Sequence, residues 1–252
     1  MTQQGFASLG LTETTLRALD AMGFTEPTPI QRQTIPLVAE GRDVIAKAPT
    51  GTGKTCAFGI PLIEALNPDM KDLQAVVLCP TRELCEQITS DLRALIRYNP
   101  AIRIAAIYGG QNMKRQIDAL AKHPHIVVAT PGRLLDHMSR GTVWLGNLYT
   151  AVLDEADEML KMGFIKDVRR ILNATPADTQ VVMFSATISR EVMDVAWEYQ
   201  HDAVEIKVDA EGDSRPHIEQ YLIHSSGSQR LEDMLDIIRS EDYHRVMVFA
   251  NM

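Results

Sequence analysis

A glycine-rich stretch, Ala48–Thr55, has the residue types and spacing of a phosphate-binding loop. It follows a short apolar run and precedes a helical pattern, so its backbone N–H groups would converge at a helix N-terminus, where anions bind. Gly51 and Gly53 allow the backbone angles and the close approach that such a loop requires. Lys54 would contact the β- and γ-phosphates of a nucleotide, and the Thr55 hydroxyl would bind Mg²⁺. The alternative is a glycine-rich turn that binds nothing.

A second candidate for chemistry is an acidic cluster that directly follows another apolar run. It holds four carboxylates within five residues, namely Asp154, Glu155, Asp157 and Glu158. Phosphoryl transfer requires one carboxylate that holds a metal ion and another that orients the attacking water. Asp154 suits the first role and Glu155 the second, because the ends of neighbouring parallel strands bring such groups together. Taken alone, the cluster is also typical of a solvated strand end.

The elements that must position these residues alternate along the chain as short β-branched runs and helical patterns, which indicates βαβ units. The runs are continuously apolar more than alternating, as in strands buried on both faces. We therefore predict an α/β fold with an open, mostly parallel sheet and helices on both faces. The predicted strands are Val44–Ala48, Ala75–Cys79, Ile102–Tyr108, His125–Ala129, Thr150–Asp154, Gln180–Phe184 and Val204–Val208.

Net charge, cysteine pattern and the distribution of apolar residues exclude several classes of protein. A net charge of -8 by itself argues against a nucleic-acid-binding protein. However, residues 205–252 hold ten of the 33 acids and only five of the 25 bases. Acids and bases are therefore nearly equal in number over the rest of the chain, and the net charge does not exclude nucleic acid. Three cysteines without a C-x-x-C pattern indicate a reducing compartment. No signal-peptide pattern and no apolar run of roughly 18 residues is present. We expect a cytoplasmic protein with no membrane contact.

The chain divides into three parts by pattern. Residues 1–208 form one expected domain, and residues 209–217 are polar with Gly and Pro, as in a linker. Residues 218–252 contain a strand-like run (Ile218–His224), a helical pattern (Leu231–Arg239) and an apolar run (Val246–Ala250). This segment is too short to close a core of its own, so we expect the start of a further domain or an appendage.

Together these motifs resemble the amino-terminal RecA-like domain of a DEAD-box RNA helicase. Asp154–Asp157 reads D-E-A-D, and the other motifs of the family follow in its order from residue 6 to residue 187. They are the Q motif with its upstream aromatic (Phe6 and Gly23–Gln31), motif I (Ala48–Thr55), motif Ia (Pro80–Leu84), the GG turn (Gly109 and Gly110), motif Ib (Thr130–Arg133) and motif III (Ser185–Thr187).

The resemblance implies an ATP-dependent RNA helicase of RecA-like, P-loop fold with ATP and Mg²⁺ as cofactors. It makes Lys54, Asp154 and Glu155 catalytic, with Thr55 and Asp154 at the metal. Gln31 would read adenine through its amide, and Phe6 would stack on the base; a loosely packed terminal aromatic is the alternative for Phe6. The implied nucleotide-binding residues are Phe6, Phe24, Thr28, Gln31, Ala48, Pro49, Thr50, Gly51, Thr52, Gly53, Lys54 and Thr55.

RNA would be held by its backbone and 2′-hydroxyls, with little base reading. The implied contacts are Pro80, Thr81, Arg82, Glu83, Gly109, Gly110, Thr130, Pro131, Gly132 and Arg133. Caps and turns of an ordinary α/β sheet are the alternative for each of them alone. Asp157, Ser185 and Thr187 would couple the nucleotide to RNA, although both hydroxyls would also suit a cap on the helix near Ser189.

The chain departs from the family pattern in two places. Glu26 stands where many members carry a basic residue, and the sequence ends at Met252, before the second RecA-like domain and its arginine fingers. We therefore expect weak nucleotide binding, poor hydrolysis and a monomer whose partners are RNA and that second domain. A DNA-directed helicase or translocase of the same superfamily and a non-catalytic nucleotide- or RNA-binding module are the alternatives.

Overall fold

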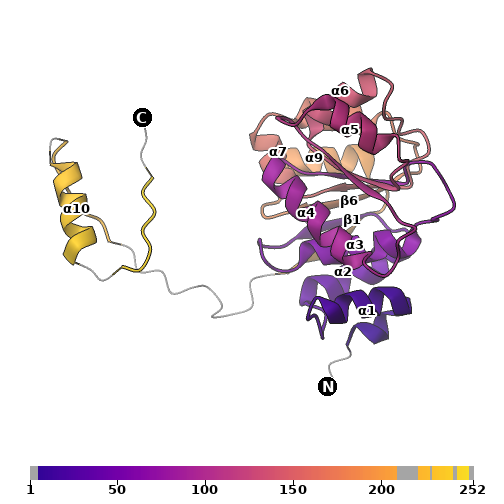
Figure 1. Ribbon diagram of the computed structural model, residues 1–252, viewed down its shortest axis with the longest axis horizontal. Coiled ribbons are helices and arrows are strands. Elements are labelled where there is room, and N and C mark those ends of the chain that lie inside the picture. Colours follow the sequence, from indigo (N-terminus) through magenta and orange to yellow (C-terminus); the bar gives the residue numbers. More distant parts are fainter. Residues whose placement is uncertain (1–4, 209–220, 228, 241–242, 250–252) are drawn as a thin grey trace. The chain divides into compact units, whose positions relative to one another are not determined.

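The computed structural model describes residues 5–208, 221–227, 229–240 and 243–249. The chain separates into two compact units, Met1–Ala210 and Glu211–Met252. The first unit is a sheet covered by helices, and the second contains the helix α10 (Figure 1). The predicted domain boundary at residue 208 therefore lies close to the division, and the predicted linker, residues 209–217, lies outside the described residues.

All seven strands predicted for the first unit are present, six of them shorter by one to three residues and the sixth, β6, longer by one. They form one sheet in the order β3-β4-β2-β5-β6-β1-β7, and every described pair is parallel. Strands β2, β4 and β5 are buried along their whole length, which explains their uninterrupted apolar runs. The strands are β1 (Val44–Lys47), β2 (Ala75–Leu78), β3 (Ile104–Ile107), β4 (Ile126–Ala129), β5 (Thr150–Leu153), β6 (Gln180–Ser185) and β7 (Val204–Lys207).

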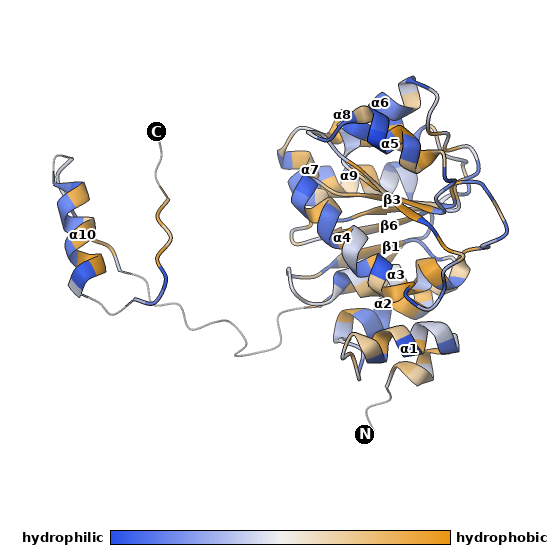
Figure 2. Ribbon diagram, viewed as in Figure 1, coloured by the Kyte–Doolittle hydropathy of each residue, from blue (hydrophilic) through white to orange (hydrophobic). Residues whose placement is uncertain are grey.

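Helices cover both faces of the sheet, as predicted. One hydrophobic core joins the sheet to α2, α3 and α4, and a second joins it to α6, α8 and α9. Figure 2 shows the sheet largely in the hydrophobic colour and many hydrophilic residues on the helices around it. The helices of this unit are η1 (Phe6–Leu9, a 3₁₀ turn), α1 (Glu13–Ala21), α2 (Pro29–Ala39), α3 (Lys54–Ala65), α4 (Arg82–Leu95), α5 (Met113–Leu120), α6 (Pro131–Ser139), α7 (Ala156–Lys161), α8 (Ile165–Leu172) and α9 (Arg190–Tyr199).

The second unit confirms its predicted helix, which runs from Arg230 to Ser240 as α10. The strand-like prediction beside it is wrong over its described residues, since 221–224 form no strand, and the apolar run forms none over 246–249. Residues 218–220 and 250 of those predictions lie outside the described residues. A strand needs a neighbour that completes its hydrogen-bond ladder, and the described part of this unit supplies none.

Because the strands are parallel, their carboxyl ends lie along one edge of the sheet, and the loops that follow β1, β2, β3, β4, β5 and β6 meet there. These loops carry every motif singled out after residue 47. In the described part of the chain no helix has the length and apolar character that crossing a membrane requires.

Candidate nucleotide and nucleic-acid site

The glycine-rich loop joins β1 to α3, which is the strand–loop–helix context that its sequence predicts. Gly51 and Gly53 have φ angles of 84° and 90°, in the left-handed region that favours glycine. Lys54 opens α3 and is 6% exposed, and its Nζ donates to the carbonyl of Ala48 at 3.3 Å. The loop is thus shaped by its glycines and presents a buried cation at a helix N-terminus, the arrangement that binds phosphate.

The Q-motif residues hold this loop from the side. The Thr28 hydroxyl donates to the carbonyl of Thr52 at 2.8 Å, and the Gln31 amide nitrogen donates to the carbonyl of Gly53 at 3.1 Å. The Gln31 amide oxygen accepts from the Thr28 N–H at 3.0 Å, which closes a capping box at the start of α2. The amide predicted to read adenine is therefore already paired at both ends with backbone groups of the protein.

The acidic cluster lies at the end of β5. Asp154 is 3% exposed, and burial raises its pKa to about 6 although the positive charge of Lys54 opposes the shift. The Glu155 N–H donates to Asp154 Oδ1 at 3.0 Å, and Glu155 has a φ of 51°, after which α7 begins. A buried carboxylate with so much lost hydration is a strong ligand for a cation, and the partly exposed Glu155 stands beside it.

One cavity of about 560 Å³ brings the phosphate loop, the Q motif and the acidic cluster together. The predicted residues that line it are Phe24, Thr28, Gln31, Thr50, Gly51, Gly53, Lys54, Thr55, Asp154 and Glu155. Ala48, Pro49 and Thr52 are not among the lining residues. The solvated-strand-end interpretation of the acidic cluster is wrong for Asp154, which is buried. Lys54, at the start of α3, and Asp154, after β5, line the same cavity.

Phe6 differs from its prediction. It is 4% exposed, packs in the hydrophobic core with residues of α2 and α3, and does not line the cavity. Neither base stacking nor a loosely packed aromatic describes this position. The sequence gives no sign of this because the short 3₁₀ turn that carries Phe6 has no apolar periodicity of its own.

The cavity also has a wall that the motifs do not predict. Glu83, Gln87 and Asp91 lie four residues apart on α4, so they share one face of that helix, and all three line the cavity. Burial raises the pKa of Asp91. Their spacing is the signal that could have revealed this face. Glu83, which was predicted to contact RNA, and Thr81 both lie at the nucleotide side of the loop after β2.

Asp157 joins the acidic cluster to the end of β6. Its Oδ2 accepts from the Thr187 hydroxyl at 2.7 Å and from the Thr187 N–H at 3.1 Å, and its own N–H donates to Ser185 Oγ at 3.2 Å. Burial opposes ionisation of Asp157, but the hydrogen bonds from Thr187 and Ser185 outweigh it and lower the pKa. The helix-cap interpretation is wrong, because Ser189 caps α9.

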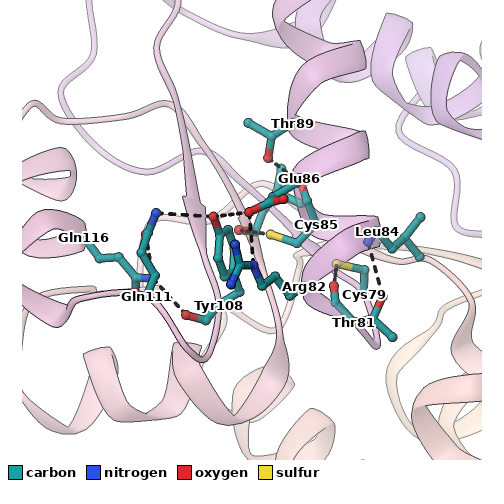
Figure 3. Close-up of polar contacts among 11 residues, drawn as sticks. Cys79, Thr81, Arg82, Leu84, Cys85, Glu86, Thr89, Tyr108, Gln111 and Gln116 are labelled. Carbon is teal, nitrogen blue, oxygen red and sulfur yellow. Dashed lines mark hydrogen bonds and ion pairs between the residues drawn. The ribbon is translucent and has the colours of Figure 1, made fainter.

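The arginine of motif Ia is held in place by two residues outside the motifs. Arg82 Nε lies 3.2 Å from Glu86 Oε1, and its guanidinium stacks on the Tyr108 ring at 5.2 Å (Figure 3). The Tyr108 hydroxyl donates to the same Glu86 oxygen. A Cβ on Gly110, whose φ is 79°, would lie 3.8 Å from Arg82 Nη1. The GG turn and motif Ia therefore form one surface, with a guanidinium beside an open stretch of backbone.

Motif Ib joins this surface through a buried glutamine. Arg133 Nη1 donates to the Gln111 carbonyl at 3.2 Å and to Gln116 Oε1 at 3.3 Å. The Gln116 amide nitrogen donates to the Tyr108 carbonyl and to Gln111 Oε1, both at 2.9 Å (Figure 3). Arg82 and Arg133 are thus connected through hydrogen bonds within one loop cluster. No short motif marks Gln116, so only the structure reveals its position.

Helix ends complete the surface. Thr81 caps α4, with its hydroxyl accepting from the Leu84 N–H at 3.2 Å, while Thr130 stands at the N-cap of α6 without a side-chain cap bond and Pro131 begins that helix. Gly109 and Gly132 are exposed, and Pro80 is buried. The cap interpretation thus holds for Thr81 and does not describe the Thr130 side chain.

Comparison with known proteins agrees with this geometry. The family model described as "DEAD/DEAH box helicase" matches residues 28–195.

The chain belongs to the DEAD/DEAH box helicase family.

Among curated members of this family, the DEAD-box ATP-dependent RNA helicase CshA of Geobacillus kaustophilus is 43% identical over 245 residues, which are 97% of this chain and 52% of that protein. CshA of Bacillus subtilis is 42% identical over 97% of this chain and 49% of its own length. The chain thus spans about half the length of the curated relatives that it matches.

Solved structures of the family show the same fold. A DEAD box protein from Methanococcus jannaschii superimposes with a TM-score of 0.79 at 42% identity, over 93% of this chain and 63% of that chain. A protein from Sulfolobus tokodaii, titled a hypothetical ATP-dependent RNA helicase, gives a TM-score of 0.72 at 38% identity, over 79% of this chain and 57% of that chain. The predicted RecA-like fold is confirmed.

Proposed function

We propose that this chain is the ATP-binding half of an ATP-dependent RNA helicase. The observation that carries the proposal is the single cavity in which Lys54, Thr55, Asp154 and Glu155 meet. In the parent protein, this half would couple ATP hydrolysis to local opening of an RNA duplex. The names of the relatives, which are ATP-dependent RNA helicases, support the same activity.

The residues of the cavity fit ATP with Mg²⁺. Lys54 and the loop N–H groups would hold the phosphates, and Thr55 and Asp154 would be the protein ligands of the metal. Two protein ligands suffice, because Mg²⁺ usually keeps several waters and takes phosphate oxygens for the rest. When bound, Mg²⁺ would neutralise charge on the phosphates. Glu155, partly exposed next to Asp154, would orient the attacking water and accept its proton.

RNA would bind the surface formed by motifs Ia and Ib and the GG turn. Arg82 and Arg133 supply positive charge there, and Gly110 lets a sugar-phosphate backbone approach closely. Asp157, through Ser185 and Thr187, would connect hydrolysis to this surface. The second RecA-like domain would close the nucleotide site. We propose that the protein works as a monomer in the cytoplasm, and the three free, buried cysteines support a reducing compartment.

The test uses the chain extended through the rest of its parent protein. We expect ATP turnover that RNA stimulates more than DNA of equal length, and a loss of about 10²–10⁴-fold in Glu155→Gln with nucleotide binding retained. Glu158→Gln, which changes an exposed carboxylate three residues away, is the matched control and should turn over like the wild type. Equal stimulation by DNA would favour the DNA-directed alternative, and absence of turnover would favour the binding module.

A further inference from the structure

A groove runs along the open edge of the sheet, next to β3. Within the part of the chain that the structure describes, β3 pairs with β4 alone, and no strand lies on its other side. Helix α4 packs with the core on one face of the sheet and α5 with the core on the other, which leaves the edge strand between them. The resulting groove has a volume of about 620 Å³.

The groove is lined by four cations and one acid. Arg93, Arg103, Arg115 and Lys122 supply the positive charge. The acid is Glu86, which already accepts from Tyr108 and Arg82, and the hydrogen bond from Tyr108 lowers its pKa. Throughout the described ranges, none of the four cations has an ion-pair partner. A polyanion would therefore find uncompensated charge here.

Two of these cations are fixed in place by backbone carbonyls. The Arg103 guanidinium donates to the carbonyls of Lys122 at 2.8 Å and His123 at 3.0 Å, and Arg93 donates to the carbonyl of Ile104 at 3.4 Å. Carbonyl partners orient a guanidinium without neutralising it, so its charge stays available to an anion. The Arg115 and Lys122 side chains are exposed beside them.

The groove is continuous with the surface that carries motifs Ia and Ib. Its wall includes Glu86, Tyr108, Gln111 and Gln116, the same residues that hold Arg82 and Arg133 (Figure 3). A strand that leaves the motif surface across Tyr108 and Gln111 would therefore pass directly into the groove. The positive charge of the groove suits the phosphates of such a strand.

We propose that this groove binds the sugar-phosphate backbone of the same RNA strand beyond the motif surface, with Arg93, Arg103, Arg115 and Lys122 as its phosphate contacts. The proposal rests on the proposed function, since it extends the path of the same ligand. Cations beside an edge strand also discourage pairing with other strands, and an acidic peptide would meet the same charge. Continuity with the Arg82 and Arg133 surface favours RNA.

The test measures the affinity of the extended chain for oligouridylates of increasing length at several salt concentrations. Arg115→Gln with Lys122→Gln removes two charges from side chains that hold no other part of the fold. We expect the wild type to gain affinity as the strand grows beyond the shortest one that binds. The groove variant should bind the short strand normally and lose that gain, and its salt slope with long RNA should fall by about 1.4, since each single-strand phosphate contact contributes about 0.7.

The control removes the same charge elsewhere, with Arg170→Gln on α8 and Lys207→Gln on β7 at the opposite edge of the sheet, and should keep the gain. A groove variant with the wild-type length dependence and salt slope would overturn the proposal, and so would selective loss of poly-glutamate binding. Arg82→Gln should weaken short and long strands alike. If the wild type binds neither the short nor the long strand, the proposed function fails as well. If the wild type binds both and the groove variant binds them equally well, the groove proposal alone fails.

Discussion

At the scale of single residues, the surface that we propose binds RNA is connected to a buried histidine, His137, whose pKa is lowered. Gln116 Oε1 accepts from Arg133 and lies 3.0 Å from His137 Nε2, so that ring nitrogen carries the proton. His137 Nδ1 lies 2.8 Å from Thr142 Oγ1, and the Thr142 hydroxyl donates to the His137 carbonyl at 3.0 Å. Burial, and after it the positive charge of Arg133, lower the pKa of His137. Protonation would add a second cation beside Arg133 in a buried place.

This arrangement predicts a pH-dependent stability. His137 has a lowered pKa in the folded chain, so below its ordinary value of 6.5 the unfolded chain binds a proton that the folded chain does not. The free energy of unfolding should therefore fall as the pH drops through this window.

The variant His137→Gln keeps a donor near Gln116 and removes the titrating group, so its free energy of unfolding should depend less on pH. Denaturant titrations of both proteins between about pH 5 and about pH 8 check this. A constant difference between them across that range would contradict it.

At the scale of elements, the connection between β1 and α3 rests on two glycines that face different surroundings. Both have left-handed φ angles, but a Cβ on Gly51 would meet open space, whereas one on Gly53 would collide with the Gln31 amide. The Q motif and the phosphate loop are thus in contact through a position where only glycine fits. The loop's shape depends on α2 as well as on its own sequence.

These two glycines form a matched pair for experiment. Each change to Ala places a side chain in the left-handed region at a cost of roughly 1–2 kcal/mol. Gly53→Ala should lose more stability than this and should weaken nucleotide binding, because Gln31 must leave the Gly53 carbonyl. Gly51→Ala should show the conformational cost alone. Chemical denaturation and titration with a fluorescent ATP analogue measure both effects, and equal losses in the two variants would show that the Gln31 contact is unimportant.

The elements also show how far a sequence can be interpreted before its structure is known. The central strands β2, β4 and β5 were predictable because strands buried on both faces are apolar along their length. The loop and acidic motifs were predictable because phosphate chemistry restricts their residues. The pairing of Gln31 with Gly53 was not, since it joins residues 22 positions apart. Gln116 and Tyr108 were missed for the same reason: their role depends on contacts with α4 and α6 that no local pattern encodes.

At the scale of the whole molecule, the two units differ in how they bury apolar surface. The first unit has two cores that enclose the sheet. In the second, α10 has no buried residue, and Leu222 and Phe249 are 84% and 89% exposed. Large apolar side chains left exposed to water in this number favour association with other apolar surfaces. All buried residues of those two cores lie between Phe6 and Ile206, so we expect the first unit to be stable without the second.

Ending the chain at Ala210 tests this directly. The shortened protein should unfold within about 0.5 kcal/mol of the 252-residue chain, because none of the first unit's core residues is removed. It should also bind less of a hydrophobic dye and aggregate more slowly, since the exposed apolar side chains of the second unit are gone.

Phe249→Asp in the 252-residue chain is the matched control: it should reduce dye binding in part and leave the unfolding transition of the first unit unchanged. A shortened chain that loses several kcal/mol would instead mean that residues 211–252 stabilise the first unit, and the RecA-like half could not then be treated as an independent folding unit.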